Sequence, residues 1–149
     1  EGIEAGRAEA AMMGLSNAEF GVKDVATLDG ARQFDFITAF DAIHDQAQPT
    51  KVLKGIADSL RPNGVFLCVD VAASSNVEEN IDHPLGPTLY MFSTLHCMTV
   101  SLALNGEGLG TVWGEQLARQ KLVEAGFTNV DVKQVPGDIM NCYYIATKG

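Results

Sequence analysis

Basic side chains are scarce in this sequence, and their shortage excludes two classes of partner. Ten Lys and Arg stand against nineteen Asp and Glu, which gives a net charge of −9. Nucleic-acid binding draws much of its affinity from basic side chains that neutralise phosphates, and anionic membrane surfaces attract proteins in the same way. We therefore expect neither a nucleic-acid partner nor a membrane partner.

Cysteines and long apolar runs are also few. The three cysteines are odd in number and form no C-x-x-C pair, so they indicate neither a disulfide framework nor a zinc or dithiol site. We expect Cys68 and Cys142, which lie in apolar runs, to be reduced and buried. Asp45, Asp82 and His83 lack the spacing of metal ligands, and we expect no metal. No apolar run approaches the roughly 20 residues of a membrane span, and no secretory segment is visible. The sequence predicts a cytoplasmic protein.

The clearest architectural signal lies in residues 34–71. The chain has 149 residues, of which 46% are hydrophobic, as expected for one globular domain. Aromatic and β-branched residues fill 34–40, which predicts a strand buried on both faces. Residues 49–60 carry one apolar stripe after Pro49 and predict a helix, and 65–71 predict a second buried strand. Together they predict a right-handed βαβ unit.

The flanking segments complete an α/β pattern. Residues 72–112 break the alternation and predict an insertion, in which the apolar stretch 88–104 forms a helix over a cleft. Two strands joined by a short turn at the C-terminal end predict an antiparallel hairpin. The further expected helices span 2–14 and 113–125, and the further expected strands span 18–24, 127–135 and 141–147.

Four blocks of sequence, in their order and spacing, carry a resemblance to a family. They are GRAEAAMMGLSNAEFGVKD, FDFITAFDAIHDQAQPTKVLKGIADSLRPNG, VFLCVDV and GEQLARQKLVEAGFTNVDVKQVPGDIMNCYYIATKG. They resemble the class I S-adenosylmethionine-dependent methyltransferases. The resemblance implies a Rossmann-like α/β sheet, mostly parallel with an antiparallel C-terminal hairpin. The whole of residues 1–149 then forms a single partial domain.

The resemblance also assigns cofactor contacts to particular positions. The acidic residue that reaches the adenine amino group matches Asp24, and the backbone N–H facing the adenine ring matches Val25. Residues bordering the methionine end of S-adenosylmethionine match Phe40, Asp41 and Ala42. Each aspartate could instead cap a turn, a common role for this residue.

Two cofactor-binding features of the family are missing from the sequence. The family's glycine-rich loop follows its first strand and its ribose-binding acid ends the second, and neither strand is recognisable here. With no initiating Met before Glu1, this suggests a domain truncated at its N-terminus. The Gly106–Gly110 pattern comes too late to be the family's loop, because such a loop joins the first buried strand to its helix. We interpret it as a flexible hinge.

Candidate catalytic residues are histidines, because an imidazole can accept the proton of a hydroxyl near neutral pH. His44 follows Phe40 at the rim where open α/β sheets bind ligands, and His96 lies in the apolar insertion. Each could equally be a structural histidine. Trp113 and Tyr90 are candidate substrate contacts, with core packing as the alternative. Methyltransferases that act on amino groups of bases carry the pattern Asn/Asp-Pro-Pro-aromatic after the fourth strand. That pattern does not follow residue 40, and its absence favours a small-molecule acceptor.

Two hypotheses of function follow, with a nucleotide or phosphate binder as a weaker third. The first is S-adenosylmethionine-dependent methyl transfer to a small molecule. The second is a non-catalytic module that has lost cofactor binding and self-associates. In the family's sheet, two strands separate those that match 18–24 and 34–40, and their loss would leave unpaired backbone groups. We therefore predict that 18–24 and 34–40 pair directly, or that a second copy fills the gap to form a homo-oligomer such as a dimer.

Overall fold

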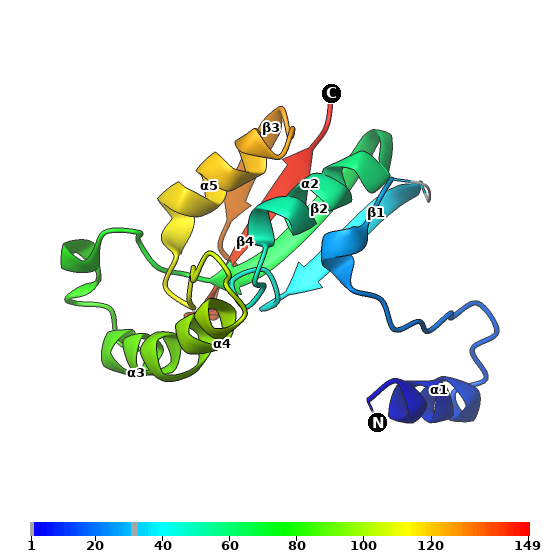
Figure 1. Cartoon of the computed structure of the whole chain (residues 1–149), viewed down its shortest axis with the longest axis horizontal. Helices are drawn as coiled ribbons and strands as arrows, with labels where there is room; N and C mark the ends of the chain where they lie inside the picture. The colour runs from blue at the N-terminus through cyan, green and yellow to red at the C-terminus, as the bar shows by residue number, and fades with distance from the viewer. Residues whose placement is uncertain (1, 31–32) are drawn as a thin grey trace.

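The computed structural model describes residues 2–30 and 33–149, which form a mixed sheet with helices packed on it (Figure 1). The strands are β1 (Phe34–Phe40), β2 (Leu60–Val71), β3 (Asn129–Lys133) and β4 (Asn141–Thr147). The helices are α1 (Gly2–Met12), α2 (Pro49–Ser59), α3 (Gly86–Phe92), α4 (Met98–Ala103) and α5 (Gly114–Glu124). Short 3-10 helices span Val25–Thr27 and Val77–Asn80, and a π-helical turn, η3, spans Ser93–Cys97.

The sheet has the order β1-β2-β4-β3. Strands β1 and β2 pair in parallel, and α2 makes the crossover between them, as the βαβ prediction required. Strands β3 and β4 form the predicted antiparallel hairpin. Strand β4 also pairs antiparallel with β2, so the parallel share of the described sheet is smaller than expected. The Rossmann-like α/β class is confirmed.

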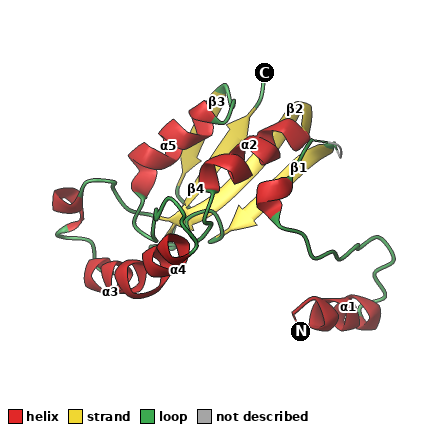
Figure 2. Cartoon of the chain, in the orientation of Figure 1, coloured by secondary structure: helices red, strands yellow, loops and turns green. Residues whose placement is uncertain are grey.

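Helices α2 and α5 cover the same face of the sheet (Figure 2). The predicted apolar stripe of α2 is buried there, with Leu53 fully inaccessible and Val52 only 1% exposed. From the sheet, Phe66 and Tyr144 enter the same core, and Phe66 stacks on Phe127 with ring centroids 5.7 Å apart. This layer of apolar contacts holds the carboxyl ends of β1 and β2 in place.

Two local expectations are met in modified form. Residues 61–64, which separate the predicted helix from the predicted strand, lie inside β2 as an irregularity, where the β1–β2 register shifts and Asn63 has a φ of 63°. The predicted helix over 88–104 is a continuous helical stretch made of α3, η3 and α4. Figure 1 shows α3 and α4 beside the end of the sheet at which β1 terminates.

The edge formed by β1 differs from the expectation. Residues 18–24 are irregular, so the predicted strand there is wrong, and with it the direct pairing of 18–24 with 34–40. A strand needs a neighbour for its backbone N–H and C=O groups, and none pairs with 18–24 among the described residues. Strand β1 is therefore an edge strand, and Phe36 and Phe40 are 56% and 62% exposed. The prediction that 34–40 is buried on both faces is wrong for the same reason.

The N-terminal helix lies away from the sheet, at the end of the irregular segment (Figure 1). Its predicted span of 2–14 agrees with α1, which buries only Ala10. Arg7 donates a hydrogen bond of 2.9 Å to the carbonyl oxygen of Phe20. Within residues 2–30 and 33–149, no helix has the length and apolar character needed to cross a membrane.

Candidate functional site

Strand β1 ends in a sharp turn at the carboxyl edge of the sheet. The backbone N–H of Asp41 still bonds to the carbonyl oxygen of Val69 at 2.9 Å, so the pairing with β2 continues one residue beyond β1. Asp41 then adopts a φ of 45°, a conformation that residues other than glycine seldom take. The turn directs the following residues, including His44, back over the end of β2.

His44 and Asp70 form a buried pair at this turn. The Nδ1 atom of His44 lies 2.7 Å from Oδ1 of Asp70, and the two residues are 4% and 0% exposed. A carboxylate only accepts hydrogen bonds, so Nδ1 carries the proton and donates it to Asp70. In the neutral ring the other nitrogen, Nε2, therefore carries a lone pair. The arrangement is that of a base whose orientation and tautomer are set by a buried acid.

The surrounding charges favour a proton on this histidine. Burial lowers the pKa of His44, but the hydrogen bond and charge of Asp70, followed by the charges of Asp45 and Asp41, outweigh burial and raise it above its ordinary value. Desolvation, and then the charge of Asp70, raise the pKa of Asp41. The site is thus a cluster of acids around one imidazole.

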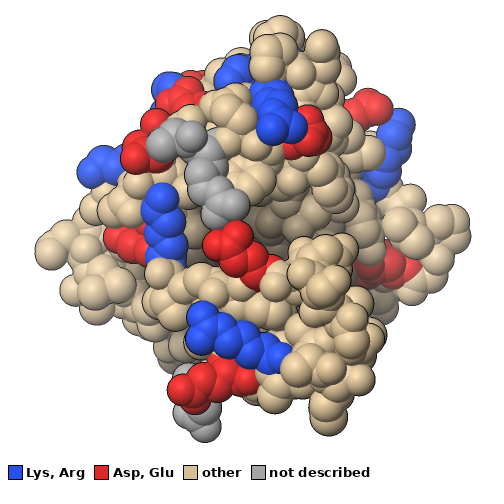
Figure 3. Space-filling model, turned by 90° about the vertical axis from the view of Figure 1, so that its right-hand side faces the viewer, with Lys and Arg blue, Asp and Glu red and all other residues tan. Residues whose placement is uncertain are grey.

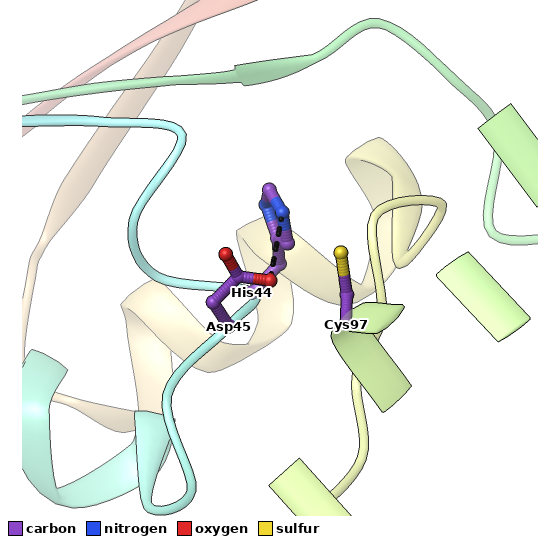
Figure 4. A group of neighbouring side chains, drawn as sticks. All are labelled: His44, Asp45 and Cys97. Carbon is purple, nitrogen blue, oxygen red and sulfur yellow. Dashed lines mark ion pairs between the residues drawn. The ribbon is translucent and has the colours of Figure 1, made fainter. Parts of the chain in front are cut away.

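Two further side chains approach His44 from the open side. Oδ1 of Asp45 lies 3.3 Å from Nε2 of His44 (Figure 4). Cys97, in η3, lies with its Sγ atom 2.8 Å from Oγ1 of Thr111. Burial raises the pKa of the Cys97 thiol. The donor atoms of His44, Asp45 and Cys97 all lie within 4.8 Å of one another.

These groups open into a cavity of about 240 Å³. Asp41, His44 and Asp45 line one side of it. The apolar lining comes from Val71, Leu89, Phe92 and Met140. A concave, mostly apolar site with a few convergent polar groups is typical of small-molecule binding.

The structure brings only some of the expected cofactor contacts to this cavity. Asp41 lines it, and Phe40 and Ala42 flank Asp41 in the chain. The side chain of Asp24 instead accepts a hydrogen bond of 3.0 Å from the N–H of Ala26 and caps a 3-10 helix, the alternative role that its residue type allows. Val25 is 38% exposed in the same segment. Asp24 does not line the cavity that Asp41 lines.

The other candidate residues lie outside the cavity. His96 is exposed on η3, although its neighbour Cys97 is buried. The hydroxyl of Tyr90 accepts a hydrogen bond of 2.9 Å from Asn80. Trp113 is 3% exposed and packs in the core beneath α5, the alternative expected for it. Of the two candidate histidines, the structure therefore brings only His44 to the cavity.

The residues that sequence reasoning missed are Asp70, Asp45 and Cys97. Asp70 had a visible signal, because it is the one acid inside the apolar run VFLCVDV. A buried carboxylate requires a partner, which could have directed attention to a histidine. The sequence offers Asp45 only Asp82 and His83 as metal-binding partners, and their spacing is unsuitable. Nothing in the spacing of Cys97 could place it beside His44.

A larger cavity of about 470 Å³ lies between the 3-10 helix Val77–Asn80, α5 and the β3–β4 hairpin. His83 lines it, as a structural histidine: its Nε2 is 2.8 Å from the carbonyl oxygen of Ala72, and its Nδ1 accepts from the N–H of Leu85. The three acids that line this cavity already have hydrogen-bond or ion-pair partners. Each of these carboxylates is therefore held by a neighbouring side chain.

The glycine-rich segment 106–110 is packed rather than free of contacts, which disagrees with its interpretation as a hinge. The N–H of Glu107 bonds to the carbonyl oxygen of Ala47 at 2.9 Å, and its side chain pairs with Lys121 at 2.6 Å. A Cβ atom on Gly106 would collide with Ala47 and Ser101. The glycines therefore permit close packing of this loop on the segment that carries His44.

A family model described as "Methyltransferase domain" matches residues 1–103 of the chain. No curated protein matches the chain in sequence. Among solved structures, an O-methyltransferase family protein from Burkholderia thailandensis matches with a TM-score of 0.70 and 17% identity, over 98% of this chain and 40% of that one.

Two other similar structures were solved with small molecules. Human N-acetylserotonin methyltransferase in complex with SAM has a TM-score of 0.61 and 20% identity, over 88% of this chain and 34% of that one. An O-methyltransferase family 2 protein from Planctomyces limnophilus in complex with apigenin has a TM-score of 0.69 and 19% identity, over 98% of this chain and 39% of that one. The chain thus spans less than half the length of these proteins, and the likeness concerns the fold.

Proposed function

The chain belongs to the methyltransferase domain family, and we propose that it takes part in the S-adenosylmethionine-dependent transfer of a methyl group to a hydroxyl of a small molecule. The observation that carries this proposal is the buried His44–Asp70 pair beside a cavity at the carboxyl edge of the sheet. Open α/β sheets bind their ligands at that edge.

His44 is the general base in this proposal. Nε2, the ring nitrogen that does not bond to Asp70, accepts the proton of an acceptor hydroxyl, which makes the oxygen a stronger nucleophile. Asp70 keeps Nδ1 protonated and stabilises the imidazolium that forms. Asp45, 3.3 Å from Nε2, adds a second negative charge next to that imidazolium. General bases of this kind contribute roughly 10²–10⁴-fold to a rate.

The cavity supports a small acceptor. Its volume of about 240 Å³ is close to the lower end of small-molecule sites, which run from about 300 to 1,000 Å³. Leu89, Phe92 and Met140 provide apolar surface for a flat or aliphatic body, while His44 meets one polar group. The proteins of similar fold include one named for N-acetylserotonin and one in complex with apigenin, both small aromatic molecules.

This chain would bind the methionine end of the cofactor S-adenosylmethionine. Asp41 lines the cavity, and the family resemblance assigns Asp41 and the flanking Phe40 and Ala42 to the methionine portion of the cofactor. When bound, S-adenosylmethionine supplies an electrophilic methyl group on a sulfonium. The acids around His44 suit a cationic group of this kind, since opposite charges attract more strongly in a partly buried site. Asp24 contributes nothing to this end, because its carboxylate caps its own helix.

The experiment is a calorimetric titration of the chain with S-adenosylmethionine, followed by incubation with labelled cofactor and matched acceptors. Phenols and the corresponding anilines of equal size form a suitable pair. We expect micromolar cofactor binding and label in the phenols. Absence of binding at millimolar cofactor would contradict a catalytic role for this chain, and label in the anilines alone would contradict the hydroxyl acceptor.

The open edge of β1 favours a second candidate function, a non-catalytic module that self-associates into a homo-oligomer. This edge exposes Phe36 and Phe40, and a β-strand edge offers unpaired backbone groups to another chain. On the molecular face in Figure 3, Lys and Arg are interspersed with Asp and Glu, so no excess of one charge on that face opposes contact between two copies.

A further inference from the structure

Three donor atoms of different chemistry converge at the end of β1. They are Nε2 of His44 and a carboxylate oxygen of Asp45, from the turn after β1, and Sγ of Cys97, from η3. All lie within 4.8 Å of one another, and Figure 4 shows the three side chains facing a common space. Two ligands of one tetrahedral zinc ion lie roughly 3.3–3.8 Å apart, given bonds of about 2.0–2.3 Å. The distance of 3.3 Å between Nε2 of His44 and Oδ1 of Asp45 falls within this range.

The electron pairs of this group require a proton or a cation between them. In the neutral ring Asp70 holds the proton of His44 on Nδ1, so Nε2 presents a lone pair to Oδ1 of Asp45; in the protonated ring Nε2–H and Oδ1 form an ion pair, whose proton a cation can replace. That oxygen is buried and accepts no hydrogen bond within the described residues. Two acceptors 3.3 Å apart repel each other unless a proton or a cation lies between them. His44 itself is 96% buried, so solvent can do little to screen the repulsion between these two atoms.

The surroundings also match those of a metal ligand set. In metal sites a histidine ligand commonly donates its other ring N–H to a carboxylate, which fixes the tautomer and the ring orientation. Asp70 does this for His44 at 2.7 Å. Oγ1 of Thr111, 2.8 Å from Sγ of Cys97, can donate to a thiolate in the same supporting role. The π-helical turn that contains Cys97 is a feature often found at functional sites.

We propose that His44, Asp45 and Cys97 bind a thiophilic divalent cation of the zinc class. A nitrogen, an oxygen and a sulfur donor suit Zn²⁺ or Co²⁺, whereas Mg²⁺ and Ca²⁺ prefer oxygen donors alone. Binding removes the proton of the Cys97 thiol, which passes to solvent, and the sulfur binds as thiolate. Three protein ligands leave the fourth position open to the cavity. Sequence spacing predicted no metal, because Cys97 reaches the site only through the fold.

The cation would also control the base. A metal on Nε2 occupies the lone pair with which His44 accepts a proton, so the metal-bound chain cannot use His44 as a base. This consequence rests on the proposed function, whereas binding of the cation does not. Zinc therefore acts as an inhibitor of the proton transfer, and a chelator restores it.

The test is a titration of the chelator-treated chain with Co²⁺, followed by displacement with Zn²⁺. Cobalt bound to a thiolate absorbs in the near ultraviolet, which reports the Cys97 ligand directly. We expect this absorption to saturate at one equivalent, to disappear in Cys97→Ser and to weaken in His44→Gln. Cys142→Ser is the matched control, because Cys142 is also buried and free but lies at the larger cavity. Its absorption should equal that of the wild type.

Asp70→Asn provides a second readout that keeps all three ligands. Loss of a carboxylate behind a metal-bound histidine typically weakens binding about 10–100-fold, and we expect the zinc affinity to fall in that range. Absence of the cobalt absorption in the wild type, or its persistence in Cys97→Ser, would overturn the proposal. Each result is obtained without cofactor or acceptor, so failure of the metal site and failure of the methyl-transfer function are distinguishable.

Discussion

Nδ1 of His44 lies 2.7 Å from Oδ1 of Asp70, although 26 positions separate the two residues in the chain. The contact depends on the parallel pairing of β1 with β2, because Asp70 lies near the end of β2 and His44 follows the end of β1. The pair is nearly inaccessible to solvent, and so its hydrogen bond is not weakened by competing water. It gives the imidazole one orientation and one tautomer.

Replacing Asp70 by asparagine should lower the pKa of His44. The hydrogen bond and negative charge of Asp70 counter the effect of burial and raise that pKa, so removing the charge leaves burial to dominate. An NMR titration of the His44 ring in chelator-treated buffer measures the change. His96→Gln, which alters an exposed histidine, should leave the His44 titration as it is. An unchanged His44 pKa in Asp70→Asn would contradict the pairing.

The raised pKa of His44 also predicts how stability depends on pH. The folded state binds this proton more tightly than the unfolded state, whose histidine has a pKa of about 6.5. The resulting stabilisation is complete below about pH 6.5 and is lost as the pH rises through the folded pKa. Urea unfolding at several pH values should show this loss in the wild type and a smaller one in His44→Gln. Equal pH profiles would be evidence against a raised pKa.

Asp138 should stabilise the β3–β4 hairpin into strongly acidic solution. Hydrogen bonds from the hydroxyl of Tyr143, the amide of Asn141 and the N–H of Met140 lower the pKa of Asp138 to about 2. An unfolded aspartate titrates near 3.9, so its contribution is complete above about pH 3.9 and is lost as the pH falls through about 2.

Acid titration of Asp138→Asn tests this contribution. The variant should unfold at a higher pH than the wild type, measured by circular dichroism. Asp131→Asn removes the same charge from β3, where Asp131 pairs only with Lys133 at 3.1 Å in the described structure, and serves as control. If both variants unfold together, the effect comes from net charge and not from the Asp138 hydrogen bonds.

Gly114→Ala should destabilise the chain. Gly114 has a φ of 75°, and an added Cβ would collide with the backbone of Ser74 and Ser75. Strain of a non-glycine residue at positive φ costs on the order of 1–3 kcal/mol, and the collision adds to it. Gly126→Ala, at a φ of 107° with no atom near the added Cβ, measures the strain alone. Urea unfolding should give Gly114→Ala a lower free energy of unfolding than Gly126→Ala. The reverse order would contradict the collision with Ser74 and Ser75.

The exposed phenylalanines of β1 should govern any self-association. Phe36→Lys and Phe40→Lys place charges on an open strand edge, which opposes pairing with another chain. Sedimentation velocity should show an oligomer for the wild type and a smaller species for the double variant. Val22→Lys, at a residue that is 89% exposed on the irregular segment, is the control. A wild-type monomer at high concentration would contradict the self-associating module.

Local patterns predicted much of the fold. The run at 34–40 and the run at 141–147 coincide with β1 and β4, and the apolar stripe after Pro49 is the buried face of α2. These elements follow from periodicity and turn chemistry within a few residues. The strand expected at 18–24 failed because a strand also requires a neighbour, which local alternation cannot supply.

The candidate site was less predictable. His44 could be proposed from its place after β1, but its partner Asp70 depends on which strands pair and in what register. Cys97 reaches the site through the π-helical turn η3, whose extra residue shifts the face on which each side chain lies. His96, one position earlier, is exposed for the same reason. Contacts of this kind arise from packing between distant segments, so the spacing of residues in the sequence does not predict them.

The most direct test of the account is the single-turnover rate of methyl transfer to a phenol by His44→Gln, compared with His96→Gln and the wild type. His44 lines the cavity, whereas His96 is exposed and does not line it. We predict a loss of roughly 10²–10⁴-fold for His44→Gln with cofactor binding retained, and little change for His96→Gln. A His44→Gln rate equal to that of the wild type would contradict the assignment of His44 as the base.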